Sequence, residues 1–160
     1  MTREILFRGK SIHGEWIYGY LNQHRGNIRY DCDCEPIADG CYYINDWQAK
    51  IDTGMYGQDY KVDPDTIGQF TGLTDKNGTK IFEGDIVAGT AYSSECIGVI
   101  VWIDEIGGFG VRYRSREDPT SWENSSILKA VSMGRQDNYA AQIIGNICDS
   151  SELLEVSGSD

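Results

Sequence analysis

Residues 65–87 read DTIGQFTGLTDKNGTKIFEGDIV, and this stretch decides the fold of the chain. Two strand-like segments, residues 65–72 and 80–82, lie on either side of Asn77-Gly78. An Asn-Gly pair readily adopts positive φ, which is typical of the tight turn between two antiparallel strands. A Glu-Gly-Asp tripeptide then leads into a further strand. The stretch therefore predicts consecutive antiparallel strands joined by short glycine turns.

The alternation of apolar and polar residues continues on both sides of this stretch. Residues 97–103, 109–113 and 141–147 alternate with the period of two that a strand requires. Residues 4–8 and 15–21 are also strand-like, and the polar loop between them predicts a hairpin. No segment shows the strand–helix alternation of a doubly wound sheet. We therefore predict an all-β fold, mainly β with minor helix: an SH3-like antiparallel barrel with an N-terminal β-hairpin extension.

The expected domain boundaries follow from these segments. Residues 1–61 are predicted to form a β-hairpin and loop region that packs on the barrel, residues 62–155 the barrel, and residues 156–160 a frayed tail. Residues 46–61 lack a clean period and predict a long loop, whereas residues 122–131 fit either a short helix or a strand. The alternation places these side chains inside the barrel: Phe70, Ile81, Val99, Val101, Phe109, Val111 and Ile144.

The charge of the chain is strongly negative and unevenly distributed. Its 160 residues carry 25 Asp or Glu and 14 Lys or Arg, for a net charge of −11. Large non-specific nucleic-acid binders are normally basic, so nucleic acid is not an expected partner. Residues 1–29 nevertheless hold five Lys or Arg and two Glu, whereas residues 30–65 hold nine acids and two Lys. We expect the basic hairpin to lie against the acidic segment; the alternative is an acidic face that meets a basic partner or mimics nucleic acid.

The sequence shows no membrane segment and no signal peptide. No run reaches the roughly 18 apolar residues that a membrane-spanning helix needs. Residues 1–10 lack the apolar core that secretory signals carry. The expected location is therefore the cytoplasm, and no membrane is expected as a partner.

The cysteines do not form a recognisable metal site. Their number, five, is odd, so we expect reduced thiols and no disulfide. Cys32, Cys34 and Cys41, with His24, are four potential zinc ligands. Structural zinc sites favour two cysteines separated by two to four residues, however, and only one residue separates Cys32 from Cys34. We therefore expect no bound metal.

The sequence lacks three common catalytic and cofactor motifs. The P-loop GxxxxGK[ST], the zinc-protease HExxH and the hydrolase GxSxG are all absent. His13 and His24 are the two candidates for a general base near neutral pH, and both fall in predicted polar loops. We therefore expect no catalytic residue, no cofactor and no enzymatic activity.

The candidate ligand-binding residues are three arginines in one strand, together with a tyrosine. Arg112, Arg114 and Arg116 occupy alternate positions and share one face, and Tyr113 lies among them in the sequence. Three guanidinium groups flanked by an aromatic ring suit the phosphates of a nucleic acid. The alternative is a solvated outer face on which the arginines pair with surplus carboxylates. The negative charge of the chain favours this alternative.

Three segments of the sequence resemble the YopX family. Residues 69–87 (QFTGLTDKNGTKIFEGDIV) are similar to the core motif of that family, residues 3–10 (REILFRGK) to its opening strand, and residues 143–154 (IIGNICDSSELL) to its ending. The departure is Ser151, where the family usually has proline. The family is carried by bacteriophages and prophages and has no established catalytic function. The resemblance implies a mostly β fold with an SH3-type barrel, and no particular activity.

The expected function combines the resemblance with the residues. We expect a phage or prophage accessory protein in the host cytoplasm, a non-enzymatic β-barrel module that binds a host or phage protein. Exposed aromatic residues and edge strands would also allow the chain to form a homo-oligomer. The alternative is a nucleic-acid-binding protein or nuclease that uses the face of Arg112, Arg114 and Arg116.

Overall fold

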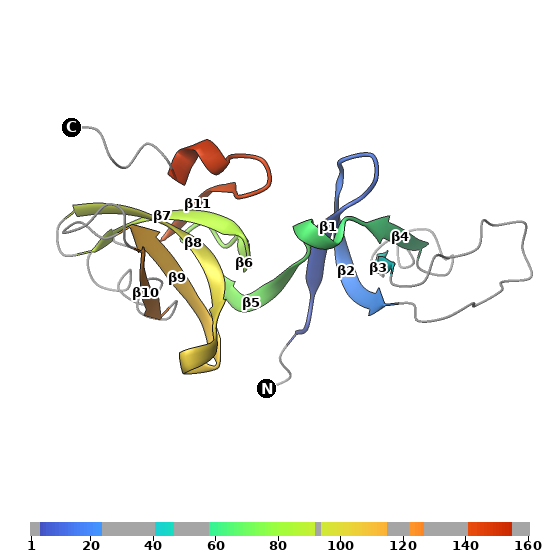
Figure 1. Cartoon of the computed structure of the whole chain (residues 1–160), viewed down its shortest axis with the longest axis horizontal. Helices are drawn as coiled ribbons and strands as arrows, with labels where there is room; N and C mark the ends of the chain where they lie inside the picture. Colours follow the sequence, from blue (N-terminus) through green and yellow to red (C-terminus); the bar gives the residue numbers. More distant parts are fainter. Residues whose placement is uncertain are drawn as a thin grey trace, which may run out of the picture. The chain divides into compact units, whose positions relative to one another are not determined.

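The structure, a computed structural model, describes residues 4–23, 41–46, 58–91, 94–114, 122–126 and 141–154. In this part of the chain the regular structure consists of β-strands and short 3-10 turns, and the strands form two antiparallel sheets (Figure 1). The chain divides into two compact units, residues 1–70 and 71–160. The fold is therefore all-β, as the period of two in the sequence predicts.

The first sheet has six strands in the order β4-β3-β2-β1-β5-β6. Their bounds are β1 (Phe7–Lys10), β2 (Trp16–Gln23), β3 (Tyr42–Asp46), β4 (Gln58–Val62), β5 (Gly68–Thr74) and β6 (Lys80–Phe82). The pairing of β1 with β2 confirms the predicted N-terminal hairpin. The extension is larger than a hairpin, however, because β3 and β4 continue the sheet beyond β2.

The strand β4 corrects the expectation of one long loop over residues 46–61. All five of its residues pair with β3 in antiparallel register. The sequence of this strand, QDYKV, has only two apolar side chains, too few for a period of two to stand out. Pairing with β3 supplies the backbone hydrogen bonds, so this strand depends on its neighbour rather than on its own composition.

One face of strands β1–β4 forms a small apolar core. Ile44 of β3 and Val62 of β4 are buried in it. A Cβ atom added to Gly9 would lie 3.1 Å from the Cβ of Val62, and one added to Gly19 would overlap the backbone carbonyl of Asn45. Glycine at position 19 is therefore required by the close approach of the backbones of β2 and β3.

The second sheet has five strands in the order β10-β9-β8-β7-β11. Their bounds are β7 (Asp85–Ala91), β8 (Ser94–Ile103), β9 (Gly108–Arg114), β10 (Trp122–Ser126) and β11 (Gln142–Asn146). Residues 122–131 were expected to form either a short helix or a strand, and β10 shows that residues 122–126 form a strand. In the described strands neither sheet closes on itself, because each order runs from one edge strand to another.

Within the described ranges, three short 3-10 turns connect or end the strands. They are η1 (Pro64–Thr66), η2 (Asp104–Ile106) and η4 (Ser151–Leu154). The last lies near the C-terminus, and its Leu153 side chain lies over Gly145 of β11. No helix in the described part of the chain has the length and apolar character needed to span a membrane.

The core of the C-terminal unit lies against one face of the second sheet. One cluster of buried apolar side chains is made up of Ile81, Val87, Ile100, Phe109, Val111 and Ala141. Five of the predicted core residues are buried as expected: Phe70, Ile81, Val99, Phe109 and Val111.

The predicted phase of β8 was wrong. In the observed register Ile100 lies opposite Val111, whereas Val99 lies opposite Arg112 and so occupies the other face of the sheet. Val99 is still buried and Val101 is half-buried. Because β8 is apolar at consecutive positions, its sequence alone does not show which side chains face the main core.

Ile144 was also expected inside, and its side chain is instead 38% exposed. The register between β11 and β7 shifts between Ile143 and Gly145, which marks a β-bulge at this position. Ile143 pairs with Val87 and packs against the core cluster, so the next residue, Ile144, which is the one inserted at the bulge, points away from that cluster. The apolar pattern of residues 141–147 gives no sign of that insertion.

The turn between β5 and β6 is confirmed. Gly78 has a φ of 83°, and its backbone N–H donates to the carbonyl of Asp75 at 3.0 Å. The carbonyl of Thr79 accepts the N–H of Asp75 at 2.8 Å, which closes the loop. A positive φ of this size suits glycine, so the Asn-Gly signal in the sequence corresponds to a real backbone requirement.

Candidate functional site

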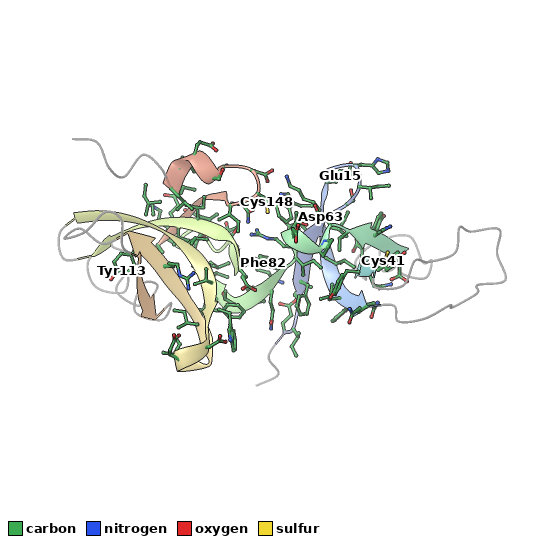
Figure 2. The ribbon with its side chains drawn as sticks, in the orientation of Figure 1. Glu15, Cys41, Asp63, Phe82, Tyr113 and Cys148 are labelled. Atoms are coloured by element: carbon green, nitrogen blue, oxygen red, sulfur yellow. The ribbon has the colours of Figure 1, made fainter. Side chains whose placement is uncertain are left out.

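The predicted arginine site is described only in part. Arg112 lies on β9 with an exposed side chain, and Tyr113 is half-buried and labelled on the same strand (Figure 2). Because neighbouring residues of a strand point to opposite faces, Tyr113 does not flank Arg112 on one surface. The side chain of Arg114 and the whole of Arg116 fall outside the described residues. Phosphate binding by these arginines stays a prediction.

The predicted metal ligands are likewise described only in part. His24, Cys32 and Cys34 fall outside the described residues. Cys41 lies just before β3 and Cys148 just after β11 (Figure 2), and neither of these two cysteines forms a disulfide. Within the described residues no three His, Cys, Asp or Glu side chains gather in a way that suits a metal ion.

Asp75 is a buried carboxylate that holds the β5–β6 turn in place. It accepts backbone N–H groups from Asn77 (2.8 Å), Thr79 (2.9 Å) and Ile143 (3.3 Å). Burial raises the pKa of Asp75, but the hydrogen bonds from Thr79, Asn77 and Ile143 together outweigh it, so the pKa lies below its ordinary value. This carboxylate is a structural anchor that stays charged at neutral pH.

Asp85 plays a similar structural part at the start of β7. Its carboxylate is almost fully buried and accepts the backbone N–H of Phe82 at 2.8 Å. The side-chain amide of Asn146 donates to its other oxygen at 3.5 Å, which ties β7 to β11. Hydrogen bonds to backbone donors are typical of a carboxylate that fixes a turn rather than one that transfers protons.

The first candidate binding surface is the end of the β8–β9 hairpin, where η2 joins the two strands (Figure 1). Trp102 is 45% exposed, and its ring meets Phe109 edge to face at 5.3 Å between centroids. The indole N–H donates to a carboxylate oxygen of Asp104 at 3.0 Å. Ile106, one turn further, is 56% exposed. We call Trp102, Asp104, Glu105 and Ile106 the hairpin tip.

The hairpin tip was not selected from the sequence, although its signal was present. Two consecutive glycines follow the acidic residues here, and Gly107 adopts φ 60° at the end of η2. What the sequence did not show is that the phase of β8 brings Trp102 onto the same face as Phe109. The two rings therefore meet at the surface, at the edge of the core.

The second candidate surface is the outer face of strands β1–β4. The register places Arg8 opposite Tyr18 and Lys10 opposite Trp16. It continues across the sheet with Tyr20 opposite Asn45, Asn22 opposite Tyr43, and Tyr43 opposite Lys61. We call this surface the aromatic–cationic face and define it by Arg8, Lys10, Trp16, Tyr18, Tyr20, Tyr43 and Lys61.

Contacts on this face join its cations to its largest ring. The guanidinium carbon of Arg8 lies 4.7 Å from the centroid of Trp16, and the ammonium of Lys10 lies 5.4 Å from it. Both distances fit a cation–π interaction. Tyr18 and Tyr20, further along β2, are 47% and 52% exposed. The face therefore has a fixed end at Trp16 and an exposed end at the two tyrosines.

Sequence reasoning did not identify this face. The excess of cations in residues 1–29 was visible, and so was the aromatic content of β2. The contribution of Tyr43 and Lys61 depends on β3 and β4, and β4 was expected to be a loop. Only the register of four strands brings these side chains onto one surface.

One of the comparisons with known proteins identifies a family. No curated protein matches the sequence significantly. Among solved structures the chain is similar to protein EF1440 from Enterococcus faecalis, with 22% sequence identity, a TM-score of 0.48, and coverage of 96% of this chain and 99% of that one. The family model described as YopX protein matches residues 7–155. The resemblance seen in the sequence is thereby confirmed, and the chain belongs to the YopX family.

Proposed function

We propose that this protein is a non-enzymatic binding module, an accessory protein of a phage or prophage that docks a protein of the host or of the phage. The observation that carries the proposal is the hairpin tip. Trp102, with nearly half of its surface exposed, lies close in the chain to Ile106, which is more exposed still, and apolar side chains grouped in this way are typical of an interaction surface.

The geometry of the hairpin tip favours protein binding because the side chain of Trp102 is already ordered before a partner binds. Trp102 is fixed on one side by the ring of Phe109 and on the other by its hydrogen bond to Asp104. A side chain that is already ordered loses little conformational entropy when a partner binds. Tryptophan is also among the residues that contribute most to protein interfaces.

The charges around the tip indicate what the partner presents. Asp104 and Glu105 are exposed beside the apolar side chains. A complementary partner has an apolar pocket for Trp102 and Ile106 with a basic rim, which also speeds association with an acidic protein. A second copy of this chain would need to supply that basic rim for homo-oligomer formation through the tip.

We further propose that the strands of the C-terminal unit form an SH3-like barrel. Two features support this. The apolar cluster gathers side chains from β7, β8 and β9 of the second sheet together with Ile81 of β6, a strand of the first sheet, as strands wrapped around one core require. The β-bulge in β11 lies where β11 returns to β7, and bulges bend strands at barrel corners.

The test of the protein-binding proposal is a matched pair of variants. Partners are captured with the full chain from a lysate of cells in which the prophage is induced, and the affinity of each identified partner is then measured with purified protein. Trp102→Ala should weaken that affinity by about 30-fold, as expected when a central interface residue worth about 2 kcal/mol is lost.

The control for this test is Ile12→Ala. Ile12 is an exposed isoleucine in the β1–β2 loop, away from the β8–β9 hairpin in sequence, and its loss should leave the affinity unchanged. Ile106→Ala should show an intermediate loss. Equal affinities for the wild type and Trp102→Ala would contradict the proposal. Sedimentation of the pure protein identifies a second copy as the partner if the oligomer disappears in Trp102→Ala.

A further inference from the structure

The aromatic–cationic face has a composition that separates it from the hairpin tip. At its paired strand positions it presents four aromatic rings, three cations, two asparagines and Asp59, and no aliphatic side chain. The aliphatic residues of these strands lie on the opposite face, where Ile44 and Val62 are buried. Flat rings among cations suit a ligand that is itself flat and anionic.

The local charge of this face is opposite to that of the whole chain. At its paired strand positions the face carries three cations, Arg8, Lys10 and Lys61, and one carboxylate, that of Asp59. The side-chain amide of Asn45 already donates to this carboxylate at 2.9 Å. At physiological salt, charges more than about 8 Å away are largely screened, so the cations of the face determine what it attracts at close range.

The spacing of the tyrosines suits successive stacked units. Tyr18 and Tyr20 are two residues apart on one strand, so their side chains emerge from the same face about 6.8 Å apart. RNA-recognition sheets use aromatic residues on neighbouring positions of a sheet to stack consecutive bases. The phosphate backbone of such a strand would then run past the cations of the face, Lys10 at the end of β1 and the exposed Lys61 on β4.

We propose that the aromatic–cationic face binds single-stranded nucleic acid. Bases stack on Tyr18 and Tyr20, while Lys10 and Lys61 contact phosphates. Arg8 holds the ring of Trp16 in position, because its guanidinium lies over that ring and is itself buried. This site is separate from the hairpin tip and from the predicted arginine site on β9, and it differs from the expectation, drawn from net charge, that nucleic acid is not a partner.

The test measures the affinity of the full chain for labelled oligothymidine and oligouridine by fluorescence anisotropy. Oligonucleotides of about 15 nucleotides are used, a length within the range of known single-strand sites. The two strands share stacking and phosphate chemistry, and their relative affinities show whether the site prefers DNA or RNA. Tyr18→Ala and Tyr20→Ala should each weaken binding about 5- to 150-fold, the range seen when one stacking ring is removed. Tyr18→Phe and Tyr20→Phe keep the rings and should retain binding, with the far-ultraviolet circular dichroism of all variants compared to verify folding.

The cations are tested by the salt dependence of the same affinity. Two or three phosphate contacts predict a slope of about −1.4 to −2.1 in a log–log plot for a single strand. Lys61→Glu should flatten this slope and weaken binding. Its matched control is Lys76→Glu, the same charge reversal at an exposed turn residue of the C-terminal unit, which should change neither the slope nor the affinity by a comparable amount.

Three results would overturn the proposal. One is the absence of binding at low salt by the wild-type chain. Another is binding that Tyr18→Ala and Tyr20→Ala leave unchanged, or that Arg112→Ala abolishes, because this would place the nucleic acid elsewhere. The third is that polyglutamate competes with the oligonucleotide, binds with the same affinity, and binds equally well to Tyr18→Ala and Tyr20→Ala. This would identify the ligand as an acidic peptide.

Discussion

Gly78 shows how a single residue can carry a structural requirement that the sequence makes visible. Its φ of 83° lies in the left-handed region, and no atom lies within 4 Å of a Cβ placed there. A larger residue at this position would therefore strain the backbone without clashing with any neighbour. Gly78→Val should lower the free energy of unfolding by about 1–2 kcal/mol, because a branched side chain resists positive φ. Urea unfolding followed by tryptophan fluorescence measures the loss.

The control for Gly78→Val is Gly108→Val at the start of β9. Gly108 does not have a positive φ, and the nearest atom to its added Cβ is 4.0 Å away. The same substitution there should cost less than at Gly78, since a branched residue is favoured in a strand. Equal midpoints for Gly78→Val and the wild type would show that the turn does not need glycine.

Asp75 makes a prediction about pH. Its hydrogen bonds from Asn77, Thr79 and Ile143 lower its pKa in the folded state, so its contribution to stability is present above its unfolded pKa of about 3.9. As the pH falls through the lower folded pKa, the carboxylate is protonated and that contribution is lost. Asp75→Asn should therefore destabilise the protein by about 1–3 kcal/mol at pH 7, and the difference from wild type should shrink below about pH 4.

The measurement for Asp75 is a series of urea unfolding curves between neutral and acidic pH. Asp65→Asn serves as the control, because Asp65 is an exposed carboxylate in η1. A difference between Asp75→Asn and wild type that stays constant down to the acid limit would mean that the carboxylate charge contributes nothing to the turn.

At the scale of elements, the approach of β2 to β3 depends on Gly19. A Cβ at this position would overlap the backbone carbonyl of Asn45, which cannot move away as a flexible side chain can. Gly19→Ala should destabilise the protein by about 1–3 kcal/mol or more, because the strands must separate. Gly89→Ala in β7 is the matched control: its nearest contact is 3.7 Å, and the substitution should be neutral or stabilising.

A comparison of the unfolding midpoints of these two alanine variants decides the point. If Gly19→Ala unfolds at the same urea concentration as the wild type, the close backbone approach of β2 and β3 is not a constraint on the fold. Nuclear magnetic resonance spectra of the Gly19→Ala variant should show the largest shifts in β2 and β3, the strands that meet at this position.

At the scale of the whole molecule, an acidic chain carries two surfaces of opposite character. The hairpin tip in the C-terminal unit is apolar with acidic neighbours, and the aromatic–cationic face in the N-terminal unit is aromatic with an excess of cations. The net charge of −11 is therefore a poor guide to either ligand, because a partner responds to the charges within a few ångströms of its own groups. The variants at Trp102 and at Tyr18 and Tyr20 consequently test the two proposals independently.

The sequence by itself determined the fold class, most of the strands and the Asn-Gly turn, because these depend on local backbone preference and on a period of two. It also determined the family, through the long motif in residues 69–87. These properties are encoded within a few consecutive residues and can be recognised without knowing what lies opposite.

Only the tertiary structure decided which side chains share a surface. The bulge beside Ile144, the phase of β8 at Val99 and the strand at residues 58–62 each depend on pairing with a distant segment. A shift of one residue in register moves every side chain of a strand to the other face. The hairpin tip and the aromatic–cationic face both depend on the register in which strands pair. The sequence of one strand does not specify that register, because it depends on the partner strand as well.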